Sequence, residues 1–218
     1  MINQLKAYPT VWLIIFYCIY LSSITYLMQS FLFTENVIFN SYGEQLSYDR
    51  IEEIIDGQNK YAWVGYAIIP ILSCTKFFLV ACCLVAGALF FDLKLKFGQA
   101  FKVAILADVV FIVPMLIKIF WFMVIQQDYT LQDLQMFSPL SILNLLDTKN
   151  IDVLWLYPLQ LLNVFELVYI LLLGFWVYQF SAKSFDKGLN MVLSSYLPAL
   201  FVWIVLLMFV TLNLNPQA

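Results

Sequence analysis

Long apolar runs separated by short polar segments make up most of the chain. A helix that crosses a bilayer needs about 20 apolar residues, and runs of that length recur too often here to be hidden inside one globular core. We therefore predict an all-α fold, a polytopic transmembrane bundle in which residues 1–218 form a single transmembrane domain. We predict about five spans, over residues 11–33, 61–91, 101–125, 155–180 and 190–212.

The polar segment between the first two spans carries an amphipathic pattern over residues 48–58. This pattern predicts a short helix that lies on the membrane or caps the bundle, with Ser47 as its N-cap. Its acidic face offers a site for a divalent cation or a basic partner, and the alternative is a solvated surface. The apolar face holds Tyr48, Ile51, Ile54 and Ile55, and the acidic face holds Asp49, Glu52, Glu53 and Asp56.

The segment between the third and fourth spans carries two helix-start signals. Thr130 with Asp133 forms a capping-box pattern. Ser138 followed by Pro139 has the order of an N-cap and a first helical residue. We expect a second short helix here, over residues 139–146, that lies at the interface or enters the membrane without crossing it.

Composition narrows the functional classes. The chain is 63% hydrophobic and 11% charged, whereas soluble domains carry about 25% charged residues. A net charge of −3 indicates no basic surface for nucleic acid. Histidine is absent, which removes imidazole bases and histidine-ligated metal sites. The cysteines have no metal-ligand spacing, so we expect no metal, no cofactor and no catalytic residue. The four cysteines, all inside apolar runs, are Cys18, Cys74, Cys82 and Cys83.

The distribution of lysine and arginine predicts the orientation. Six basic residues lie on the side of the N-terminus and the two short linkers, and three lie on the other side. We therefore expect a multi-pass membrane protein with its N-terminus in the cytoplasm and its C-terminus outside. The six are Lys6, Lys94, Lys96, Lys102, Lys183 and Lys187, and the three are Arg50, Lys60 and Lys149.

Four ionisable residues fall within the predicted spans: Lys76, Asp108, Lys118 and Glu166. An unpaired charge at the bilayer centre costs about 2.5–3.5 kcal/mol, so these groups should be paired, neutralised or hydrated. Depth along the helices favours the pairs Lys118–Glu166 and Lys76–Asp108. Such a network either fixes the register of the helices or forms a proton or ion path.

From about residue 91 onward, three segments carry a family resemblance. They are FDLKLKFGQAFKVAILADVVFIVP, FSPLSILNLL and VFELVYILLLGFWVYQFSAKSFDKGLNMVLSSYL. In these segments the chain resembles the Yip family, five-span membrane proteins named for their interaction with Ypt/Rab GTPases, in its bacterial form. The resemblance implies a five-helix bundle with a cytoplasmic N-terminus, located in a bacterial inner membrane. It transfers no catalytic residue, and GTPase binding is not expected, because about ten residues precede the first predicted span.

Two functions of different classes remain open. The first is a non-enzymatic membrane scaffold, assembly or trafficking-like factor, with the lipid bilayer and either a membrane-protein partner or a second copy of the chain as its contacts. The second is a small-solute or ion transporter, or a permease-like subunit, that uses the four buried charges. An intramembrane enzyme would have to rely on carboxylates such as Asp108 and Glu166, and no nucleotide-binding loop of the G-x-x-x-x-G-K-[ST] type is present.

Overall fold

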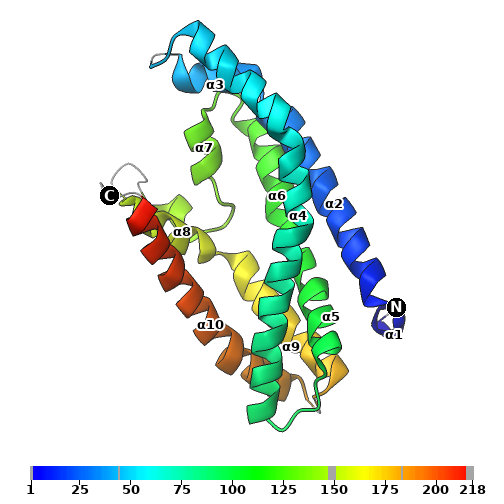
Figure 1. Ribbon diagram of the computed structural model, residues 1–218. Coiled ribbons are helices and arrows are strands. Elements are labelled where there is room, and N and C mark those ends of the chain that lie inside the picture. The colour runs from blue at the N-terminus through cyan, green and yellow to red at the C-terminus, as the bar shows by residue number, and fades with distance from the viewer. Residues whose placement is uncertain (1, 44, 147–150, 183, 215–218) are drawn as a thin grey trace.

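The computed structural model describes residues 2–43, 45–146, 151–182 and 184–214, and the elements within them are helical (Figure 1). One isolated antiparallel bridge joins Ser141 and Asn163. The predicted all-α fold is therefore confirmed. The α-helices are α1 Ile2–Ala7, α2 Thr10–Leu32, α3 Glu35–Tyr42, α4 Tyr48–Phe90, α5 Phe97–Asp108, α6 Ile112–Phe120, α7 Leu131–Met136, α8 Val153–Leu161, α9 Val164–Phe180 and α10 Phe185–Leu214. Short 3₁₀ turns lie at η1 Val109–Phe111 and η3 Ile142–Leu145, and a π-helical turn lies at η2 Trp121–Ile125.

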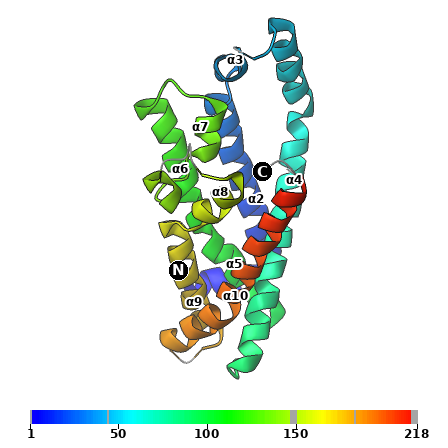
Figure 2. The same cartoon turned by 90° about the vertical axis from the view of Figure 1, so that its left-hand side faces the viewer.

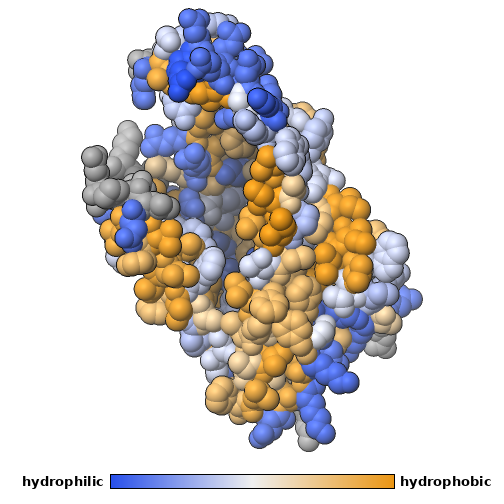
Figure 3. Space-filling view, viewed as in Figure 1, coloured by the Kyte–Doolittle hydropathy of each residue, from blue (hydrophilic) through white to orange (hydrophobic). Residues whose placement is uncertain are grey.

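Among the residues that the structure describes, four helices are long and apolar enough to cross a membrane: Thr10–Leu32, Tyr48–Phe90, Phe97–Ile125 and Phe185–Asn213. The shorter apolar helix α9 has 17 residues, which gives it a length of about 25 Å, at the lower limit for crossing. Figure 3 shows hydrophobic residues over the middle of the visible face and hydrophilic residues gathered at its two ends. This chain is thus a membrane protein, with four long spans and a shorter fifth candidate.

The two ends of the bundle differ. One end, here called the linker end, contains α1 and the α4–α5 and α9–α10 connections. The other end, here called the α3 end, contains α3 and the start of α4, which projects beyond the neighbouring helices (Figures 1 and 2). Helix α10 leans away from α4 toward the α3 end, and the space-filling surface is hollowed between them (Figure 3).

Helix α4 runs without interruption through 43 residues, a length of about 65 Å. The expectation of a separate short helix over residues 48–58 is therefore wrong. Its apolar face does pack as predicted: Ile51 and Ile55 are buried against Ile38 of α3. Because α3 covers this face, the segment extends the spanning helix and is not required to lie flat on the membrane.

The third span changes helix type before Pro114. Residues 109–111 form a 3₁₀ turn between α5 and α6. Proline lacks a backbone N–H, and its ring crowds the carbonyl four residues earlier, which is Val110. The helix therefore departs from α geometry at this point, one turn before the proline.

The predicted fourth span, residues 155–180, is wrong as a single helix. It is broken at Leu162 and Asn163 into α8 and α9. The segment after Ser138 also differs from prediction: it forms a turn and the short η3, because Leu140 adopts a positive φ of 54°. The Thr130–Asp133 capping box of α7 is confirmed, with the Asp133 amide donating to the Thr130 hydroxyl.

The main core joins α4, α5, α9 and α10. Glycines allow the closest helix approaches. A Cβ atom on Gly87 of α4 would lie 2.6 Å from the Cβ of Ser195 on α10. A Cβ on Gly188 would lie 2.8 Å from the carbonyl oxygen of Gly174. The small residues of α4 therefore bring α10 against it, as expected for helix contacts in membranes.

Candidate functional site

Asp108, the last residue of α5, is a buried carboxylate that forms an ion pair. Its side chain is 2% exposed, and its Oδ1 lies 2.5 Å from Nζ of Lys76 on α4. The hydroxyl of Tyr17 on α2 donates a hydrogen bond to Oδ2 of the same carboxylate. Asp108 lies about 16 Å along the helix axis from Phe97, the first residue of α5. One carboxylate thus joins three helices in the bundle.

Lys76 has aromatic as well as ionic contacts. Its Nζ lies 4.3 Å from the ring centroid of Phe111 and 5.5 Å from that of Tyr169. Ring faces attract cations, more strongly where water is excluded. The lysine side chain is nevertheless 45% exposed. Its stem therefore reaches the surface of α4, while its ammonium group is held inward by Asp108 and the two rings.

A second acidic group, Glu166, lies in the first turn of α9. Asn163 caps this helix: its Oδ1 accepts the backbone N–H of Glu166 at 2.8 Å. The Glu166 side chain accepts a hydrogen bond from the hydroxyl of Tyr196 on α10, also at 2.8 Å. The residue is 9% exposed. Glu166 thus ties the start of α9 to α10 through an acid–tyrosine pair.

Tyr169 lies between the partners of the two acidic groups, with its ring near Lys76 on one side and Tyr196 on the other. Its ring centroid lies 5.1 Å from that of Phe111 and 5.5 Å from that of Tyr196. The residue is completely buried, and its hydroxyl has no hydrogen-bond partner within the described residues. A buried hydroxyl without a partner is costly, so it marks a place of unusual chemistry. We call Tyr17, Lys76, Asp108, Glu166, Tyr169 and Tyr196 the buried polar cluster.

The structure brings together only part of the predicted charge network. Lys76 and Asp108 pair as expected. The expected Lys118–Glu166 pair is wrong, because the Lys118 ammonium donates to the carbonyl oxygen of Leu134 on α7, whereas Glu166 faces Tyr196. The helix break before α9 explains the difference, since it displaces Glu166 from the continuous span assumed for the depth comparison.

Sequence reasoning missed the three tyrosines of the cluster. Tyr17, Tyr169 and Tyr196 lie in apolar runs, where tyrosine reads equally well as an ordinary packing residue. The available signal was weak: Tyr169 lies near the middle of its predicted span, and Tyr17 and Tyr196 lie six residues inside the start of theirs. Their importance comes from partners on other helices, which the local pattern does not contain.

The break between α8 and α9 has its backbone groups satisfied by the η3 segment. The amide of Ile142 donates to the carbonyl of Leu162 at 3.0 Å, and the amide of Val164 donates to the carbonyl of Leu140 at 3.2 Å. Non-helical backbone at membrane depth requires such partners. These two hydrogen bonds satisfy backbone groups at the break, so α9 can begin at Val164, two residues before Glu166, with little loss of free energy.

The predicted acidic face lies far from the cluster, at the start of α4. Its four carboxylates, Asp49, Glu52, Glu53 and Asp56, are all exposed. Arg50 forms an ion pair with Glu53 on the same helix. Within the described residues, no three acidic or cysteine side chains gather in a metal-binding arrangement. The face is therefore a mainly negative, solvent-facing surface at the α3 end.

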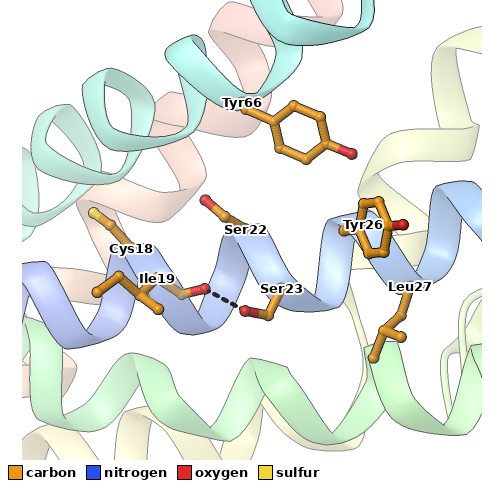
Figure 4. A pocket seen from close by; sticks show the side chains of 7 residues that line it. All are labelled: Cys18, Ile19, Ser22, Ser23, Tyr26, Leu27 and Tyr66. Carbon is orange, nitrogen blue, oxygen red and sulfur yellow. Dashed lines mark hydrogen bonds between the residues drawn. The ribbon is translucent and has the colours of Figure 1, made fainter.

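A pocket of about 600 Å³ opens between α2 and α4 (Figure 4). Its wall includes the hydroxyl-bearing residues Ser22, Ser23, Tyr26 and Tyr66, together with apolar side chains, and none of its lining residues is charged. Lys76, Asp108, Lys118 and Glu166 are not among them. The pocket is thus separate from the buried polar cluster.

Comparison with known proteins places this arrangement in no family. No family model matches the chain, and no curated protein or solved structure matches it either. What this site can do chemically is therefore inferred from the side chains of the buried polar cluster alone. Its carboxylates, hydroxyls and ammonium group can hold charges in place or exchange protons.

Proposed function

We propose that this chain is a non-enzymatic membrane scaffold or assembly factor of the Yip type in a bacterial inner membrane. The observation that carries the proposal is the continuity of α4. This one helix of 43 residues joins the ion pair at Lys76 to an exposed acidic face at the α3 end. A continuous helix from a membrane core to this acidic face, here called the platform (Asp49, Glu52, Glu53 and Asp56), suits a protein whose task is to hold a partner.

Packing holds α4 against neighbouring helices at both levels. In the core, Asp108 joins α4 to α5 and, through Tyr17, to α2. Near the platform, Ile51 and Ile55 of α4 pack against Ile38 of α3. Buried polar pairs of this kind fix helix register, even where they add little net stability. The platform therefore has a defined position relative to the bundle.

The charge of the platform indicates the kind of partner. Four exposed carboxylates share the surface with Arg50, which leaves a net negative face. Opposite charge steers association and favours the correct partner. A membrane protein with a basic segment outside the membrane fits this face, given the proposed orientation with the N-terminus in the cytoplasm and the C-terminus outside. The resemblance of the three segments to the Yip family supports a non-enzymatic role.

Cross-linking in cell membranes followed by affinity purification tests the proposal. The four platform acids are changed to their amides, Asp49→Asn, Glu52→Gln, Glu53→Gln and Asp56→Asn. A matched control changes Asp92 and Asp186, at the linker end, to asparagine. We expect a partner to be recovered at least about fivefold less with the platform variant and unchanged with the control. Equal recovery from both variants, or recovery of no partner with the unaltered chain, contradicts the proposal.

A second candidate, a solute or ion transporter or permease-like subunit, has one specific observation in its favour. The helix break at Asn163 places Glu166 in the first turn of α9, and the buried hydroxyl of Tyr169 in the same cluster has no partner among the residues that the structure describes. Broken helices next to polar groups in the bilayer are typical of transporters. Proton flux in proteoliposomes, compared among the unaltered chain, Glu166→Gln and Asp108→Asn, tests it. Flux no faster than in empty liposomes contradicts this function.

A further inference from the structure

The pocket between α2 and α4 lies within the apolar part of both helices. Its α2 residues run from Cys18 to Leu27, which places them about 12–25 Å along α2 from the linker end. Figure 4 shows Cys18 and Ser22 pointing from α2 toward α4, and Tyr66 of α4 extending into the same space. The pocket is open at its side, where Ile19 and Tyr26 are 59% and 62% exposed. Molecules dissolved in the bilayer are the ones that meet this opening.

The hydroxyl groups of the pocket are not equally satisfied. Ser23 donates to the carbonyl of Ile19 at 2.8 Å, the usual solution for serine in a membrane helix. Tyr66 donates to Oε1 of Gln29 at 2.8 Å. Ser22 and Tyr26 have no hydrogen-bond partner in the part of the chain that the structure describes. In hydrocarbon, a polar group without a partner is expensive, so these two hydroxyls favour a ligand that offers oxygen atoms.

The lining also selects the charge of the ligand. None of the lining side chains is charged, and a charged head group would be drawn to the membrane surface. A volume of about 600 Å³ lies in the range of about 300–1,000 Å³ that is usual for small-molecule sites. We propose that this pocket binds a membrane lipid with an uncharged, hydroxyl-bearing head group, of the diacylglycerol class. The lipid enters from the side, and its hydroxyl and ester oxygens pair with Ser22 and Tyr26.

The apolar parts of the lipid match the remaining surface. Ile19 lies three residues before Ser22, and Leu27 lies immediately after Tyr26, so they flank the hydroxyl pair along α2. The acyl chains lie along these side chains and continue into the bilayer, while the head group stays beside Ser22. This binding is independent of the proposed scaffold role, because the pocket and the acidic face lie on different parts of the chain.

Photo-cross-linking of the full chain in nanodiscs tests the proposal. The probe is diacylglycerol with a photoactivatable group in one acyl chain, and cross-linked peptides are located by mass spectrometry. We expect labelling concentrated on the peptide that contains residues 18–27 and competed by unlabelled diacylglycerol. Ser22→Phe, which fills the pocket, should reduce this labelling at least about fivefold. Tyr26→Phe, which removes only a hydroxyl, should reduce it by a smaller factor.

Two controls separate a built site from general contact with lipid. Ser194→Phe places the same ring on the exposed surface of α10, where the Ser194 hydroxyl bonds to its own helix, and should leave the labelling unchanged. A phosphatidylcholine probe with the same acyl chains should label residues 18–27 much less. Equal labelling by both probes, or labelling spread over exposed helices and indifferent to Ser22→Phe, overturns the proposal. Thermal unfolding of each variant checks that it is folded.

Discussion

Tyr17 on α2 donates a hydrogen bond to Asp108 at the end of α5, although the two residues lie 91 positions apart in the chain. The other oxygen of Asp108 faces the ammonium group of Lys76 on α4. Three helices are thereby attached to a single carboxylate that is almost completely buried. In a bilayer, where apolar side chains gain little from exchanging lipid for protein, such polar contacts and close packing determine which helices meet.

Removing one side of the ion pair should be costly. Lys76→Met leaves the Asp108 carboxylate buried without its cation, and we expect the free energy of unfolding to fall by about 3 kcal/mol. The double variant Lys76→Met/Asp108→Leu removes both charges and should recover most of this loss. Unfolding by SDS in mixed micelles measures both. Lys94→Met, at an exposed position of the linker end, is the matched control and should have no effect. A double variant as unstable as Lys76→Met would contradict the pairing.

The unpartnered hydroxyl of Tyr169 should behave differently from the paired hydroxyl of Tyr196. Tyr169→Phe removes a buried hydroxyl that has no partner in the described part of the chain, so we expect the free energy of unfolding to rise by about 1 kcal/mol. Tyr196→Phe removes the hydrogen bond to Glu166 and should lower that free energy by about 1 kcal/mol. The same SDS titration compares the two variants. A loss of stability in Tyr169→Phe as large as in Tyr196→Phe would show that the hydroxyl binds a partner, such as water.

The contact between α4 and α10 should depend on Gly87. An added Cβ would meet Ser195 at 2.6 Å, and we expect Gly87→Ala to lower the free energy of unfolding by about 1–3 kcal/mol. Gly65 lies on the same helix with nothing within 4 Å of an added Cβ. Gly65→Ala should therefore raise that free energy, by about 0.5–1 kcal/mol from helix propensity. Thermal unfolding in detergent compares the stability of the two variants with that of the unaltered chain. Unchanged stability in Gly87→Ala would show that α10 does not approach α4 this closely.

Tyr129, in the connection after the third span, should make stability sensitive to alkaline pH. Its hydroxyl donates to the carbonyl of Leu32 at 3.2 Å, at the end of α2. Burial raises the pKa of this phenol above its usual value of 10.0. The stabilisation is therefore fully present below about pH 10 and is lost as the pH rises through the higher pKa of the folded state.

A comparison with Tyr129→Phe isolates this group from the other tyrosines and the lysines. The variant lacks the hydrogen bond and should be less stable at neutral pH, but it should lose less stability than the unaltered chain above pH 10. Melting temperatures recorded from about pH 7 to 11 test this difference. Parallel pH curves for the two proteins would contradict the assignment.

Local chemistry made several elements predictable. The capping box at Thr130 and Asp133 is contained in four consecutive residues, so the start of α7 could be identified from the sequence. The apolar face of residues 48–58 was also visible, because helical periodicity is a local property. The sequence did not show that this segment and the second predicted span form one helix, α4. The polar residues between them are equally typical of a loop between two helices.

The amino-acid sequence by itself determined that this is an all-helical membrane protein with charged groups in its apolar spans, because length, hydropathy and periodicity are written along the chain. Tertiary structure decided the partners of those charges. Lys76 meets Asp108, Lys118 turns to a backbone carbonyl of α7, and Glu166 meets a tyrosine. Depth along a helix restricts which groups can meet, but rotation of each helix and the break at Asn163 select the pair. Those features depend on packing between distant segments, of which Gly87 against Ser195 is one example.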